Sequence, residues 1–141
     1  MRIVVSACLL GHNCKYNGGN NRSQAVLDML KGHEILPLCP EVMGGLPTPR
    51  TPAEIRDGKV CNAKGEDVDI FFRRGVEKAM EKLQGQTIDL AILQSRSPSC
   101  GVKQIYDGTF SKQLIHGRGL FAQALAEAGI PLLDAEDLPL K

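Results

Sequence analysis

The sequence predicts an α/β layer sandwich, in which helices cover the faces of one parallel β-sheet. Two observations predict this fold class. Short apolar runs alternate with helical patterns along the chain, and such alternation is typical of parallel strands joined by right-handed crossovers. The chain has 141 residues, which is the size of one compact domain rather than two. We therefore expect a single Rossmann-like domain over residues 1–141, with long loops at the carboxyl edge of its sheet.

Four apolar runs are expected to form the strands. Each is short, rich in Ile, Leu and Val, and bounded by polar or turn-forming residues, which is typical of buried strands. The runs are Ile3–Ala7, Ile35–Leu38, Ile88–Leu93 and Ile130–Leu133.

Three helical patterns lie between these runs. The first follows Asn21 and ends at Gly32. The second is the clearest, because over Asp67–Leu83 apolar residues recur at steps of three and four opposite a charged face. The third spans about Arg118–Ala128 and is ended by a glycine. The predicted element order is therefore β-α-β-α-β-α-β.

Three connections are too long to be plain turns. Loops beyond about 12–15 residues in a compact domain are usually functional or disordered. Within the second connection, Asp57–Gly65 is predicted to form a small hairpin with turn residues at both ends. The three connections are Leu9–Asn21, Pro40–Glu66 and Ser95–Gly117.

The composition excludes several kinds of partner. Seventeen Lys and Arg oppose sixteen Asp and Glu, so the net charge of +1 gives no support to binding a nucleic acid polymer or a membrane surface. No apolar stretch approaches the roughly 18–20 residues of a membrane span. Five cysteines in a chain large enough to fold without disulfides indicate a reducing compartment, so we expect a cytoplasmic protein. The sequence does not decide between a monomer and a homodimer.

Three cysteines follow three of the predicted strands. Cys8 and Cys39 come directly after the first and second strands, and Cys100 lies a few residues past the third. Free cysteines often simply pack in a core, but the carboxyl ends of parallel strands meet at one sheet edge, where open α/β sheets bind ligands. Cys14 is near enough in sequence to join these three or replace one. Cys61 lies in the predicted hairpin and is expected to point elsewhere.

Converging thiolates favour a metal centre. They are soft ligands that select iron-sulfur clusters, zinc or Cu(I). The sequence has no C-x-x-C pair, which argues against a zinc ribbon and a thioredoxin-type dithiol, although zinc held by cysteines and His12 stays open. Three thiolates from three loops fit a cubane cluster in which one iron lacks a protein ligand. Such an iron can act as a Lewis acid on a substrate atom.

Polar residues accompany two of these cysteines. Glu41 lies two residues after Cys39 and can act as an acid or a base there, or it can pair with Arg50. Arg50 could instead clamp an anionic group of a substrate. The segment Ser95–Gly101 presents three hydroxyls around Cys100, which suit hydrogen bonds to cluster sulfurs or to a substrate oxygen but are also ordinary turn chemistry.

Six segments spread over nearly the whole chain are Val5–Gly11, Tyr16–Gly18, Cys39–Val42, Gly44–Leu46, Ser97–Gly101 and Ile105–Phe110. Taken together, they resemble one family, the TudS-type thiouracil desulfurases. The resemblance implies a [4Fe-4S] cluster held by Cys8, Cys39 and Cys100. It also implies that the catalytic carboxylate and serine fall on Glu41 and Ser97.

The resemblance also implies a substrate and a reaction. The substrate would be a small thiolated pyrimidine, thiouracil or its nucleotide, whose sulfur is replaced by oxygen. In our hypothesis, Ser97 positions a water molecule and Glu41 deprotonates it, so that it attacks the ring carbon without net electron transfer. Two residues depart from the family pattern: Asn17 stands where we expect Asp, and Gln94 where we expect Lys. They leave the ligands intact but leave the exact substrate open.

Two other classes of function stay open from the residues alone. One is a cysteine-nucleophile or thiol redox enzyme that uses Cys100, which predicts a colourless protein with one thiol sensitive to alkylation. The other is a cluster- or zinc-binding module that senses metal or oxidant, or that hands on sulfur. Such a module would bind metal but desulfurise no thiopyrimidine.

Overall fold

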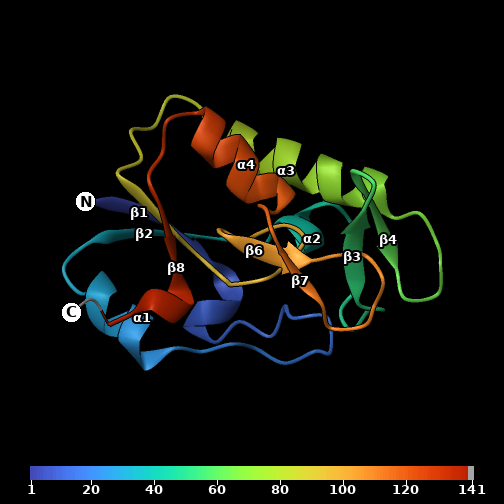
Figure 1. The fold of residues 1–141 in the computed structure, drawn as a ribbon. Coiled ribbons are helices and arrows are strands. Elements are labelled where there is room, and N and C mark those ends of the chain that lie inside the picture. The colour runs from blue at the N-terminus through green and yellow to red at the C-terminus, as the bar shows by residue number, and fades with distance from the viewer. Residues whose placement is uncertain (140–141) are drawn as a thin grey trace.

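The computed structural model describes residues 1–139, and its centre is a parallel sheet of four strands in the order β2-β1-β5-β8 (Figure 1). The predicted α/β class is confirmed, whereas the Rossmann-like detail stays a prediction. Each apolar run supplies one strand. The last strand begins two residues later than expected, because Pro131 has no N–H to donate to a neighbouring strand. The strands are β1 (Arg2–Ser6), β2 (Glu34–Leu38), β5 (Leu90–Leu93) and β8 (Leu132–Asp134).

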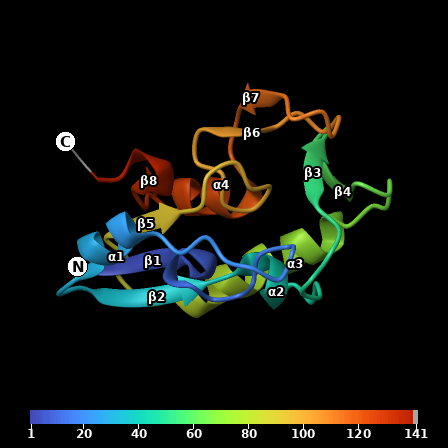
Figure 2. The same cartoon turned by 90° about the horizontal axis from the view of Figure 1, so that it is seen from below.

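Helices cover both faces of this sheet (Figure 2). Alternate residues of β1 point to opposite faces, so Val4 packs with α3 and α4 while Ile3 and Val5 pack with α1. All three side chains are fully buried, and burying an aliphatic side chain of this size stabilises the fold by about 1.5–3 kcal/mol. The helices are α1 (Gln24–Leu30), α3 (Asp69–Leu83) and α4 (Leu120–Glu127).

The three predicted helices are present with shorter bounds. The first begins later than expected because Ser23 caps it, its hydroxyl accepting a hydrogen bond from the Val26 N–H at 3.3 Å. Gly129 follows α4 with φ +80°, the left-handed conformation that commonly ends helices. Within residues 1–139, no helix combines the length and the apolar character needed to cross a membrane.

Two hairpins stand beside each other at one end of the sheet (Figure 1). The predicted hairpin Asp57–Gly65 is shifted, because Asp57 and Gly58 both adopt left-handed φ values (+51° and +78°) and form the two-residue turn between its strands. The second hairpin was not predicted and lies inside the long connection 95–117. The hairpin strands are β3 (Ala53–Arg56) with β4 (Lys59–Asn62), and β6 (Gln104–Tyr106) with β7 (Leu114–His116).

A four-residue helix, α2 (Pro40–Met43), begins where the sequence predicts only a loop. It packs directly on α3 through two glycines. A Cβ atom at Gly44 would lie 1.9 Å from the Phe71 carbonyl oxygen, and one at Gly75 would lie 1.8 Å from the Pro40 oxygen. Only glycine permits this backbone contact. It fixes the position of the chain directly after β2.

Candidate cofactor and active site

A cavity of about 480 Å³ opens at the carboxyl edge of the sheet. Its volume lies within the range of about 300–1,000 Å³ that is usual for small-molecule sites. One wall comes from the segments that follow β1, β2 and β5, and the other comes from the two hairpins. This is the edge at which open α/β sheets bind their ligands.

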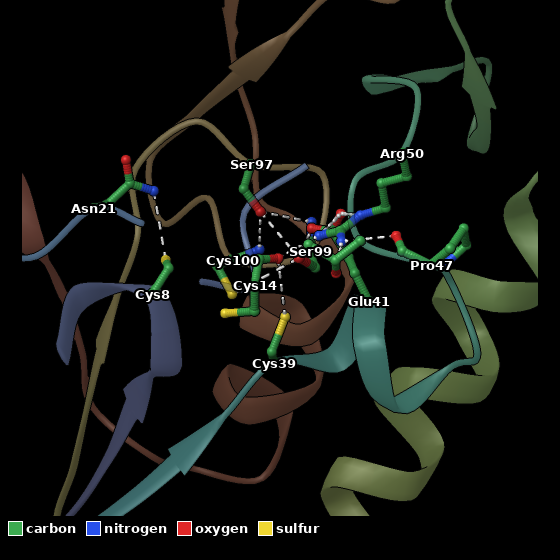
Figure 3. Close-up of polar contacts among 11 residues, drawn as sticks. Cys8, Cys14, Asn21, Cys39, Glu41, Pro47, Arg50, Ser97, Ser99 and Cys100 are labelled. Carbon is green, nitrogen blue, oxygen red and sulfur yellow. Dashed lines mark hydrogen bonds and ion pairs between the residues drawn. The ribbon is translucent and has the colours of Figure 1, made fainter. Parts of the chain in front are cut away.

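Four of the five cysteines line the cavity. Cys8, Cys39 and Cys100 do so from the three strand-end segments, as their positions predict, and Cys14 joins them (Figure 3). Cys61 lies on β4 and is not part of the lining. All five thiols are free. The structure therefore brings together one more thiol than the three expected ligands.

The thiols differ in how readily they lose a proton. A hydrogen bond with the Cys14 thiol is the main reason that the pKa of Cys39 is lowered to about 7, and burial opposes it. The pKa of Cys8 is lowered first by Cys14 and further by the Asn21 amide, which lies 3.5 Å from its sulfur. The same contacts raise the pKa of Cys14. Burial raises the pKa of Cys100 to about 12. Thiolates are the form that binds metals, so Cys8 and Cys39 are the thiols best prepared for that role.

Glu41 projects from α2 and pairs with a buried Arg50. The Arg50 Nη2 and Nε atoms lie 3.2 and 3.3 Å from Glu41 Oε1, and the two side chains are only 7% and 16% exposed. The other donors of Arg50 bond to the Pro47 carbonyl, the Thr48 hydroxyl and the Cys14 carbonyl. A guanidinium has five N–H groups, and four of them donate hydrogen bonds here, while Nη2 also forms the ion pair with Glu41. Arg50 thus holds Glu41 and the Cys14 loop in place and has most of its donors engaged within the protein.

The serine loop reaches Glu41 through Ser99. The Ser99 hydroxyl donates to Glu41 Oε2 at 2.8 Å and lies 3.0 Å from the Ser97 hydroxyl oxygen. Because Ser99 gives its single proton to Glu41, Ser97 is the donor in the contact between the two serines. The Ser97 oxygen in turn accepts hydrogen bonds from the N–H groups of Ser99 and Cys100. The result is a directed chain of hydrogen bonds, Ser97 to Ser99 to Glu41.

Ser99 is the residue that sequence reasoning missed. It is 2% exposed and forms the only link between Ser97 and Glu41 among the hydrogen bonds of residues 1–139. Three serines at alternate positions indicated that this loop belongs to the site, but they did not indicate which hydroxyl points inward. The start of α4 decides this, because the N–H groups of Leu120 and Phe121 donate to the carbonyls of Pro98 and Ser99 at 2.9 and 2.8 Å.

The wall formed by the hairpins carries aromatic and cationic side chains. Within residues 1–139, four non-glycine residues adopt left-handed φ values, and three of them line the cavity: Phe110 (+56°) and Lys112 (+62°) in the second hairpin, and Arg96 (+65°) in the segment after β5. This conformation costs roughly 1–2 kcal/mol per residue. Residues held in such conformations tend to gather at functional sites. The aromatic lining residues of this wall are Tyr106 and Phe110, and Tyr16, in the segment after β1, lines the cavity as well.

The two departures from the family pattern lie in different places. Gln94 lines the cavity at the end of β5. Asn17 does not line it, and its side chain accepts a hydrogen bond from the Gly19 N–H at 2.9 Å, which closes a turn. Of the two, only Gln94 is placed to contact a ligand.

The donor set suits a cluster better than a single ion. His12 is not part of the cavity lining, so it gives no support to a zinc site with the cysteines. In the part of the chain that the structure describes, no group of three His, Cys, Asp or Glu side chains is arranged to hold one metal ion. Soft thiols spread around a cavity, with amide and hydroxyl donors beside them, fit an iron-sulfur cluster.

Fold and site together define an α/β protein that gathers thiols, a carboxylate and hydroxyls around one cavity, as expected of an enzyme with a thiolate-bound cofactor. Residues 3–137 match the family model described as 2-thiouracil desulfurase, and the chain belongs to this family. The resemblance carried by the loops is thereby confirmed.

Two similar proteins cover almost the whole chain. The chain is 36% identical over 146 residues to the uncharacterized protein YbbK of Bacillus subtilis (strain 168), which covers 96% of this chain and 97% of YbbK. It is 41% identical to a solved structure described as the [4Fe-4S]-dependent thiouracil desulfidase TudS. That match has a TM-score of 0.90 and covers 98% of this chain and 93% of the other.

Proposed function

We propose that the protein desulfurises thiouracil or its nucleotide, replacing the sulfur by oxygen, with a [4Fe-4S] cluster held by Cys8, Cys39 and Cys100. One observation carries the proposal: three strand-end thiols, Glu41 and the serine loop line one cavity in a chain 41% identical to a thiouracil desulfidase. We further propose that residues 1–141 form one desulfurase domain that acts in the cytoplasm, where free thiols stay reduced.

The proposed ligands come from three separate segments, which leaves one iron of a cubane cluster without a protein ligand. When bound, such a cluster supplies a Lewis acid that polarises the carbon-sulfur bond of the substrate. We assign Cys14 the role of a neighbour that hydrogen-bonds to Cys8 and Cys39 and does not replace either of them.

The chain's own groups supply the acid-base chemistry. Glu41 takes a proton from water, which attacks the ring carbon, and the Ser97 hydroxyl turns its proton from Ser99 to this water to position it. Ser99 keeps Ser97 and Glu41 in one hydrogen-bonded chain, and Arg50 holds the other oxygen of the carboxylate. Thiocarbonyl plus water gives carbonyl plus hydrogen sulfide. The atoms and electrons balance, so the reaction needs no oxidant or reductant.

The test is anaerobic purification followed by reconstitution with iron and sulfide. We expect about four irons per chain and broad visible absorption. Incubation with thiouracil should then release uracil and sulfide in equal amounts. A fully loaded protein that produces neither would overturn the proposal and would favour a cluster-binding sensor or carrier. A colourless protein with one reactive thiol would favour a cysteine-nucleophile enzyme.

A further inference from the structure

Aromatic residues are scarce in this chain, and three of its six line the cavity. The sequence has four Phe, two Tyr and no Trp. Phe72 and Phe121 are buried in the core, whereas both tyrosines and Phe110 line the cavity. The core does not need aromatic residues at the cavity. Their presence there therefore points to a ligand with a flat apolar face.

One carboxylate fastens the loop that carries Phe110. Oε1 of Glu54, on β3, accepts hydrogen bonds from the N–H groups of Gly108 and Phe110 at 3.0 and 3.1 Å. Arg56, on the same strand, donates from Nε to the Gly108 carbonyl at 2.8 Å. A Cβ atom at Gly108 would lie 2.7 Å from the Ile55 carbonyl oxygen, so the loop sits directly on the backbone of β3. The hairpin β3–β4 therefore holds the loop of the other hairpin in one position.

The backbone of Phe110 is held in a conformation that bulky residues rarely adopt, with φ +56°. Such a conformation persists only where the surroundings enforce it. The hydrogen bond from the Phe110 N–H to Glu54 is a contact that does so. Phe110 lines the same cavity as the thiols and Glu41.

We propose that Phe110 and Tyr106 form the face on which the pyrimidine ring of the substrate stacks, and that Glu54 is the positioning residue that holds Phe110 there. This inference rests on the proposed function, because thiouracil is a planar heterocycle of the kind that aromatic side chains bind by stacking. The stacked ring lies between this face and the thiol wall. The proposal makes the hairpin wall the part of the site that selects for a planar ring.

The test uses uracil, which has the ring of the substrate but no sulfur, so that binding is measured without turnover. Isothermal titration calorimetry of the iron-loaded protein gives the dissociation constant for uracil and for dihydrouracil, whose ring is not planar. We expect Phe110→Ala to weaken uracil binding about tenfold, as base-aromatic stacking predicts, and to abolish the preference for uracil over dihydrouracil. Iron content should stay unchanged, because no proposed ligand lies on the hairpins.

Glu54 has its own pair of variants. Glu54→Gln keeps an oxygen that accepts both N–H groups and should bind uracil nearly as the wild type does. Glu54→Ala removes the acceptor and should weaken uracil binding, though less than Phe110→Ala does. Leu114→Ala truncates an exposed apolar residue of the same hairpin that does not line the cavity, and it serves as the matched control.

The possible outcomes separate this proposal from the proposed function. Uracil binding that is unchanged in Phe110→Ala, or that is not detectable in the wild type up to the solubility of uracil, overturns the stacking face. If the protein binds uracil through Phe110 but does not desulfurise thiouracil, the proposed stacking face is supported and the proposed reaction is overturned. Equal losses in Leu114→Ala and Phe110→Ala would assign the effect to folding of the hairpin and would also overturn the proposal.

Discussion

The two walls of the cavity are built in different ways. The thiol wall follows the ends of three strands and the short helix α2, so its residues are placed by the sheet and by the packing of α2 on α3. The aromatic wall belongs to two small hairpins, and its position depends on side-chain hydrogen bonds and left-handed residues. The comparison teaches that the proposed cofactor ligands are held by topology, whereas the proposed substrate contacts are held by a few local contacts. Changes to each wall should therefore have separable effects.

The largest expected effect is loss of the cluster from the thiol wall. Cys8→Ser, Cys39→Ser and Cys100→Ser each remove a proposed ligand, so each should bring the iron content of the reconstituted protein close to zero. Iron analysis and visible absorption measure this loss.

Two further cysteine variants sharpen the comparison. Cys61→Ser lies outside the cavity and should keep about four irons per chain. Cys14→Ser should also keep them, because Cys14 is proposed as a neighbour rather than a ligand. If Cys14→Ser loses its iron while one of the three proposed ligand variants retains it, the ligand set is wrong and Cys14 belongs in it.

A second effect concerns turnover without loss of iron. Glu41→Gln and Ser97→Ala should keep the visible absorption and lower kcat by about 10²–10⁴-fold, the usual contribution of general acid-base groups. Ser99→Ala breaks the link between Ser97 and Glu41 and should lower kcat with little change in KM, while Ser99→Thr, which keeps the hydroxyl, should recover part of the loss. Steady-state kinetics with thiouracil measure these values. A fully active Glu41→Gln variant would remove Glu41 from the mechanism.

A third and smaller effect on the thiol wall should follow from a substitution on α3, at Gly75. Gly75→Ala introduces a Cβ atom 1.8 Å from the Pro40 oxygen, so α2 must move with Cys39 and Glu41. Alanine usually stabilises a helix by about 1 kcal/mol over glycine, but here overpacking should destabilise the fold by about 1–3 kcal/mol. Thermal unfolding and iron content report both consequences. Glu77→Ala, on the exposed side of α3, is the control, and a Gly75→Ala variant as stable as this control would contradict the close contact.

The smallest effect is a difference in reactivity among the thiols of the iron-free protein. The pKa of Cys39 is lowered to about 7 and that of Cys100 is raised to about 12. Since the thiolate is the reactive form, alkylation of Cys39 by iodoacetamide should rise through about pH 7 and then level off. Cys100 should react far more slowly at neutral pH, because almost all of it is then the thiol. Mass spectrometry of the peptides distinguishes the two, and faster labelling of Cys100 at pH 8 would contradict this order.

The sheet and its thiol wall were largely predictable from the sequence, because both follow from local patterns and topology. Apolar runs indicate strands, and residues that follow parallel strands meet at one edge. This places Cys8, Cys39 and Cys100 around one cavity, although their role as ligands stays a prediction. That Cys14 joins them, and that Arg50 is buried, depend on loop conformations that no periodic pattern encodes.

The aromatic wall was not predictable for a related reason. The strands β6 and β7 have three residues each, too few for a pattern to stand out, and they lay inside a segment predicted as a loop. Phe110 reaches the cavity through a left-handed backbone and a hydrogen bond to Glu54, which is 56 residues away in the sequence. Ser99 likewise turns inward because the Phe121 N–H, at the start of α4, donates a hydrogen bond to the Ser99 carbonyl.

Ser6, at the end of β1, connects the floor of the cavity to the pairing of the central strands. Its buried hydroxyl accepts a hydrogen bond from the Gln94 N–H at 3.0 Å, beyond the last paired residues of β1 and β5. This adds one rung to the pairing of the two strands just where they begin to separate. Because central strands are the last to open in native-state hydrogen exchange, we expect the Gln94 N–H to exchange more slowly than the N–H groups of the two-stranded hairpins. The proposed cofactor would thus lie on the part of the site that is tied to the central sheet, and the proposed substrate on the part that side-chain contacts hold.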